Sequence, residues 1–89
     1  MAWTNKGLIL TFLGKYNEAI KACDKAIETN PHNSIAWANK GNILSKFSKP
    51  YEAIKAYDKA IEINPQNSAA WYNKAVTLDK LNKSNLQVK

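Results

Sequence analysis

A tryptophan recurs every 34 residues in this 89-residue chain, at Trp3, Trp37 and Trp71. A large aromatic at a fixed period much longer than a helical turn indicates a repeated supersecondary unit. Residues 2–34 aligned without a gap on residues 36–68 match at 22 of 33 positions, which chance does not produce. A third copy begins at Ala70 and loses the pattern near Asn82. The chain therefore contains two and a half copies of one unit.

Each complete unit reads as two helices. Its apolar residues recur at three- and four-residue spacing, which is typical of an amphipathic helix. Gly14 follows the first helix, and Pro31 disfavours helix at Asn30 and so ends the second. Asn33 and Ser34 can accept backbone N–H bonds and cap the next helix. The pattern predicts no strand and five helices, at 2–13, 17–29, 35–47, 51–63 and 69–82.

The small residues indicate how a helix pair closes. Gly41 lies in mid-helix, where glycine costs up to about 1 kcal/mol relative to alanine, so we expect a packing reason for it. We expect Ala53 to face it from the next helix and to let the two backbones approach closely. Trp37 would cover that contact, and the same residues in the first unit would repeat the arrangement. The tryptophans of the first two units are therefore interpreted as core residues.

The residues that carry a family resemblance are, in the second unit, Trp37, Gly41, Ala53, Tyr57, Ala60 and Pro65. All of them recur in register in the first unit except Tyr57, in whose place the first unit has Cys23. In this spacing the chain resembles a tetratricopeptide repeat array. The resemblance implies an all-α fold, a right-handed α-solenoid of antiparallel helix pairs. It covers the chain as a single array over 1–89, with repeats at 1–34, 35–68 and 69–89. The second unit departs from the first at its inter-helix turn, where Ser48 and Pro50 stand in place of Gly14 and Tyr16.

The resemblance also implies that the first helices of successive units line a concave groove that binds peptides. We expect one stripe of each first helix to face inward, at the spacing of a helix face. The candidate groove residues are Asn5, Leu8, Phe12, Asn39, Asn42, Lys46, Tyr72, Asn73 and Lys80. Within this set Asn5, Asn39 and Asn73 recur as a ladder, one in each unit.

An asparagine side chain both donates and accepts, so a ladder of three can pair with the main chain of an extended peptide. Leu8 and Phe12 would add an apolar anchor site at one end, and Lys46 and Lys80 a positive charge at the other. We therefore expect a protein or peptide partner with acidic or C-terminal carboxylate groups. The alternative that the ladder is only part of the repeat pattern stays open. Chaperone-binding members of the family use a carboxylate clamp, of which only Asn39 is matched, so the resemblance does not favour chaperone tails.

Charge and chemistry narrow the remaining function classes. The formal net charge is +6, but all thirteen basic residues are lysines without clustered runs, which disfavours nucleic acid. His32 stands alone in a turn and Cys23 on an apolar helix face, so we expect no metal, no cofactor and no enzyme. The apolar run 8–13 is too short to span a membrane, and a cytoplasmic location is the default.

The third copy has a first helix without a partner helix. That leaves the side formed by Trp71, Ala75 and Leu78 with nothing predicted against it. Three interpretations follow: a segment of a longer array, assembly with a second copy, or a last helix prolonged through 82–89. We expect self-association through this side, as a homo-oligomer. A peptide-binding scaffold and a structural assembly module therefore both remain as functions.

Overall fold

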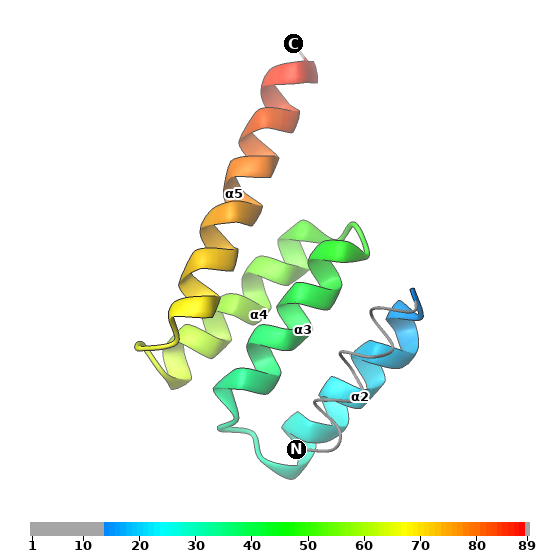
Figure 1. Ribbon diagram of the computed structural model, residues 1–89, viewed down its shortest axis with the longest axis vertical. Helices are drawn as coiled ribbons and strands as arrows, with labels where there is room; N and C mark the ends of the chain where they lie inside the picture. The colour runs from blue at the N-terminus through cyan, green and yellow to red at the C-terminus, as the bar shows by residue number, and fades with distance from the viewer. Residues whose placement is uncertain (1–13, 89) are drawn as a thin grey trace.

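The computed structural model describes residues 14–88, and this part of the chain is entirely helical, without a strand (Figure 1). Its four helices are α2 (Tyr16–Thr29), α3 (Ser34–Lys46), α4 (Pro50–Ile63) and α5 (Ser68–Val88). The helix expected at 2–13 lies outside the described residues. Each predicted start is confirmed within one residue, as are the ends of α2, α3 and α4. The predicted end at 82 is wrong, because α5 continues to Val88 with no Gly or Pro to stop it.

Successive helices run antiparallel and lie side by side in chain order (Figure 1). Within the described residues α3 is the central element, because it packs against α2, α4 and α5. Among the four described helices, α2 packs mainly against α3, and α5 packs mainly against α4. One helix of the second unit is thus enclosed, whereas the helix of the third unit is not.

Asparagine caps begin α3 and α5, as predicted. The Asn33 side chain accepts a hydrogen bond from the Ala36 amide at 3.0 Å, and Asn67 makes the equivalent bond at 3.1 Å. The prediction that Ser34 also caps is wrong. Its hydroxyl is buried, donates to the Ala60 carbonyl at 2.9 Å and accepts from the Asn67 amide at 2.8 Å. Ser34 therefore links the start of α3 to α4 and to the next turn.

The turn between α3 and α4 has a serine, Ser48, at the position where the first unit has Gly14. Gly14 has a φ of 78°, and its equivalent Ser48 takes the same left-handed conformation with a φ of 61°. This conformation is costly for a residue with a Cβ. Pro50 opens α4, where its fixed φ suits the first helical position and its missing N–H is not needed.

The second unit closes around Gly41 and Tyr57. A Cβ on Gly41 would lie 2.6 Å from a ring carbon of Tyr57, so only glycine admits the ring here. The space that Gly41 leaves is filled by the aromatic ring of Tyr57, and the expectation that Ala53 faces Gly41 stays a prediction. Ala53 is fully buried in the same cluster, together with Leu44 and Ala56.

Ion pairs connect successive units at the repeat period. Lys40 of α3 reaches Asp24 of α2 at 2.7 Å, and Lys74 of α5 reaches Asp58 of α4 at 2.6 Å. Each pair joins a first helix to the second helix of the preceding unit. Half-exposed pairs of this kind add little stability and help to fix how one unit docks on the next.

Candidate functional site: a groove between α3 and α5

A groove of about 570 Å³ lies between α3 and α5, with α4 at its base. Helix α3 contributes Asn42, Ser45 and Lys46, and α5 contributes Asn73, Val76 and Lys80. Ile43, Thr77, Tyr57 of α4 and Tyr16 of α2 complete the lining. The two facing helices are each the first helix of a unit, so this is the side on which the resemblance places a peptide.

Four of the nine predicted groove residues line this space: Asn42, Lys46, Asn73 and Lys80. Asn39 is half-buried but does not line it, and Tyr72 is 70% exposed outside it. The other three, Asn5, Leu8 and Phe12, lie outside the described residues. Within the described part the amide pair that meets in the groove is therefore Asn42 with Asn73, and Asn39 is not part of it.

A hydrogen-bond network joins three helices on the groove floor. The Tyr57 hydroxyl donates to the Asn42 Oδ1 at 2.6 Å, and the Asn73 Nδ2 donates to the same oxygen at 3.0 Å. The Thr77 hydroxyl donates to the main-chain oxygen of Asn73 at 2.8 Å. The network crosses from α4 to α3 to α5, so it ties the second unit to the third at the floor of the groove.

Tyr57 is the member of this network that sequence reasoning missed as a site residue. It stands where the first unit has Cys23, and its 1% exposed side chain marks it as core. The signal that could have found it is the joint change of the two units, because Asn42 replaces Leu8 where Tyr57 replaces Cys23. A polar pair replacing an apolar pair predicts a hydrogen bond.

Burial raises the pKa of Tyr57 to about 12, while a hydrogen bond with Thr77 acts in the opposite direction. Desolvation disfavours the charged phenolate, so the side chain stays neutral and keeps its proton near neutral pH. The hydroxyl is therefore a permanent donor to Asn42.

The rim of the groove is positive. Lys46 of α3 and Lys80 of α5 make no ion pair with any residue of the described part of the chain. By contrast, most lysines of α2 and α4 alternate with acidic residues. Two cations on facing helices, beside amides that can donate, form a surface complementary to carboxylates.

The rest of the described chain offers little chemistry. Burial, with the Asp24 charge adding to it, raises the pKa of the Cys23 thiol to about 11, against an opposing effect of Lys40. The thiol is thus protonated and packed with Ala19 and Ile43, which confirms its prediction as core filler. Between residues 14 and 88 no three His, Cys, Asp or Glu side chains gather as a metal site would require. None of the described helices combines the length and apolar character that a bilayer crossing needs.

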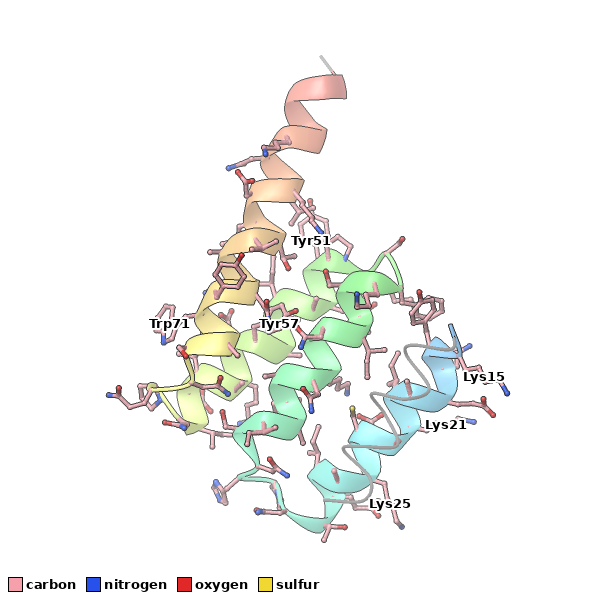
Figure 2. The ribbon with its side chains drawn as sticks, viewed as in Figure 1. Lys15, Lys21, Lys25, Tyr51, Tyr57 and Trp71 are labelled. Atoms are coloured by element: carbon pink, nitrogen blue, oxygen red, sulfur yellow. The ribbon has the colours of Figure 1, made fainter. Side chains whose placement is uncertain are left out.

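A second surface lies on the far side of α5 from the rest of the fold. Trp71 is 50% exposed and Leu78 44% exposed, and Ala75 between them is exposed as well. Figure 2 shows the Trp71 side chain on the outer side of α5. Its indole N–H still donates to the Pro65 carbonyl at 2.9 Å, as Trp37 does to Pro31. We call these three residues of α5 the open face.

Comparison with known families identifies the class of protein. A tetratricopeptide repeat family model matches residues 1–33 and 34–67, and a second tetratricopeptide repeat model matches residues 56–89. The chain belongs to the tetratricopeptide repeat family. No curated protein matches the chain.

Two similar solved structures are tetratricopeptide repeat domains of Spaghetti (RPAP3), both bound to the HSP90 peptide SRMEEVD. The second domain has a TM-score of 0.84 at 26% identity, over 94% of this chain and 78% of that one. The first has a TM-score of 0.80 at 25% identity, over 89% of this chain and 63% of that one. The present chain thus spans less than two thirds of the first domain's chain.

Proposed function

We propose that this chain is a non-catalytic protein-interaction scaffold that binds an extended acidic peptide in the groove between α3 and α5. The observation that carries the proposal is the pair Lys46 and Lys80, which rise from facing helices without a carboxylate partner in residues 14–83. Between them the groove floor holds the amides of Asn42 and Asn73. Cations at the rim would receive ligand carboxylates, and the amides would pair with the peptide main chain.

The two similar structures support a peptide ligand of this kind. The peptide bound in both, SRMEEVD, carries two glutamates and an aspartate beside an apolar methionine and valine. Only Asn39 of this chain matches the carboxylate clamp of the chaperone-binding members. SRMEEVD therefore serves as a model acidic peptide and is not assumed to be the natural partner. The natural ligand is proposed as a protein segment with carboxylates, and a cytoplasmic location stays a prediction.

The test is the affinity of fluorescently labelled SRMEEVD by anisotropy. Lys46→Ala and Lys80→Ala should each weaken binding about two- to fivefold, as expected for partly exposed ion pairs, and the loss should shrink as salt rises. Lys25→Ala on α2 is the matched control, because it removes the same charge far from the groove and should leave affinity unchanged. Equal affinity of all three variants would reject the groove.

The ligand supplies a second comparison. The analogue SRMQQVN with an amidated C-terminus, which carries no carboxylate, should bind more weakly than SRMEEVD and should be insensitive to Lys46→Ala. Amidation of the SRMEEVD C-terminus separates the two sources of carboxylate. A large loss on amidation assigns the lysines to a C-terminal carboxylate, whereas a small loss assigns them to acidic side chains.

A second candidate function is assembly with a second copy of this chain through the open face of α5. The specific observation is that the equivalent residue of the second unit, Trp37, packs against α4 and the start of α5, whereas Trp71 is half exposed. The chain's own repeat thus indicates that a helix of this repeat type fits the open face, and a second copy carries such helices. A dimer mass in light scattering at about 100 µM, lost in Trp71→Ser, would support it. A monomer mass would reject it.

A further inference from the structure

Asn42 and Tyr57 are a coupled difference between the two complete units. The first unit holds Leu8 and Cys23 at the equivalent positions, and neither side chain could form the bond that joins Asn42 to Tyr57. The residues next to Tyr57 on α4 are largely the same in both units, so the polar pair distinguishes the second unit from the first. It lies on the groove floor, where a ligand would make its contacts.

The Tyr57 hydroxyl is held rigidly. Its side chain is 1% exposed and its ring fills the space above Gly41, where a Cβ would be 2.6 Å from the ring. The ring therefore has no room to turn its hydroxyl elsewhere. The 2.6 Å bond to the Asn42 Oδ1 is accordingly a fixed constraint on that amide.

The two bonds to Asn42 determine which way its amide faces. A carbonyl oxygen accepts two hydrogen bonds, and the Asn42 Oδ1 receives one from Tyr57 and one from Asn73. Its Nδ2 then points away from both partners and makes no bond within the described residues. The Asn73 Nδ2 donates to the same oxygen, so the Oδ1 of Asn73 remains as an acceptor.

We propose that Tyr57 is a positioning residue of the peptide groove. By holding the Asn42 amide in one orientation, it makes the floor present a donor, Asn42 Nδ2, beside an acceptor, Asn73 Oδ1. A donor and an acceptor side by side match the C=O and N–H of an extended peptide main chain, and their order favours one chain direction. This inference rests on the proposed function. It adds a subsite that recognises the direction of the ligand main chain, whatever the charge of the ligand side chains.

The first test compares Tyr57→Phe with Tyr51→Phe, which removes the same hydroxyl from an exposed position on α4 outside the groove. Tyr57→Phe should weaken SRMEEVD and the carboxylate-free, amidated SRMQQVN by the same factor, about three- to tenfold, at every salt concentration. Lys46→Ala should affect only the acidic peptide. Tyr51→Phe should bind both peptides as the wild type does.

The second test addresses chain direction. With both peptides acetylated and amidated, the reversed peptide DVEEMRS has the composition and charge of SRMEEVD, so a groove that responds to side-chain charge alone would bind both equally. The wild type should distinguish the two, and Tyr57→Phe should narrow the difference at least threefold. In Asn42→Asp an oxygen can still accept from Tyr57 and Asn73, but the Nδ2 donor that faces the ligand is lost. This variant should therefore also lose the preference for one peptide direction. The matched variant Asn39→Asp should keep that preference.

The side-chain amide signals of Asn42 and Asn73 in nitrogen-15 NMR spectra provide a readout that needs no ligand. They should shift in Tyr57→Phe and stay in place in Tyr51→Phe. If the wild type binds SRMEEVD and Tyr57→Phe binds SRMEEVD and DVEEMRS each with the affinity of the wild type, the positioning role is overturned while the groove stands. If the wild type binds none of these peptides, the proposed function is overturned, and the positioning role with it.

Discussion

Helices α3 and α5 begin with the same signal and meet different surroundings. Each starts with an asparagine cap followed by serine, alanine and tryptophan, and each pairs a lysine with an aspartate of the preceding helix. Helix α3 packs against three helices, whereas α5 packs mainly against α4 and keeps an open face. The repeated residues thus specify a helix and the side of it that faces the fold. Whether the tryptophan of that helix is buried depends on whether a following helix covers it.

The largest expected effect comes from the two tryptophans. Trp37→Ala removes an aromatic that packs in two core clusters and should lower the free energy of unfolding by about 3 kcal/mol. Trp71→Ala removes a half-exposed ring and should cost about 1 kcal/mol. Urea denaturation followed by circular dichroism measures both. Equal losses would mean that the open face is covered in solution and would break the comparison.

The next effect concerns the small residues four positions after each tryptophan. Gly41→Ala forces a methyl against the Tyr57 ring and should destabilise by about 1–3 kcal/mol, despite the better helix propensity of alanine. At the equivalent Ala75, which is exposed, Ala75→Gly should cost about 0.5–1 kcal/mol through propensity alone. Thermal unfolding of both variants checks this, and a stabilised Gly41→Ala would contradict the tight contact.

A smaller effect separates the ends of the two helices. Ser48 closes α3 with a φ of 61°, whereas the equivalent Asn82 lies inside α5. Ser48→Gly relieves the left-handed strain and should stabilise by about 0.5–1 kcal/mol. Asn82→Gly puts glycine inside a helix and should destabilise locally, seen as faster amide hydrogen exchange near residue 82. If Ser48→Gly lowered the free energy of unfolding, the left-handed backbone at Ser48 would not be a source of strain.

The smallest expected difference lies in the two inter-unit ion pairs. Lys74→Met should cost about 0.5 kcal/mol, as a partly exposed pair does. Lys40→Met should cost about 0.5 kcal/mol more, because the Lys40 ammonium also lies 5.5 Å from the centre of the Trp37 ring. Denaturation in low and high salt checks the difference, since salt weakens the ion pairs and leaves the packing. If Lys40→Met and Lys74→Met lowered the free energy of unfolding equally, the contact of Lys40 with the Trp37 ring would contribute nothing to stability.

The 34-residue period was sufficient to predict the helices and most of their ends. Asn33 and Pro50 explain why, since caps and turn residues act within a few positions of the chain. The end of α5 could not be placed, because nothing in residues 82–88 forbids helix and the decision rests on weak propensities. Ser34 was misjudged because its hydroxyl is used by a carbonyl 26 residues away.

For the groove, the helix-face rule grouped Asn42, Lys46, Asn73 and Lys80, and these four line one space in the structure, while their binding of a peptide stays a prediction. It placed Asn39 there as well, because a stripe drawn on one helix does not say which of its edges the neighbouring helix covers. Tyr57 escaped prediction because it belongs to the second helix of its unit, and its ring lies against Gly41 and lines the groove. That contact depends on tertiary packing.

The central claim, that the groove and not the open face receives an acidic peptide, is tested most directly by an NMR titration of the nitrogen-15-labelled chain with SRMEEVD. The account predicts that shift changes concentrate at Asn42, Lys46, Asn73 and Lys80 and reach saturation, with the Trp71 indole signal unchanged. Saturating changes at Trp71, Ala75 and Leu78 with a quiet groove, or no changes at all, would contradict it.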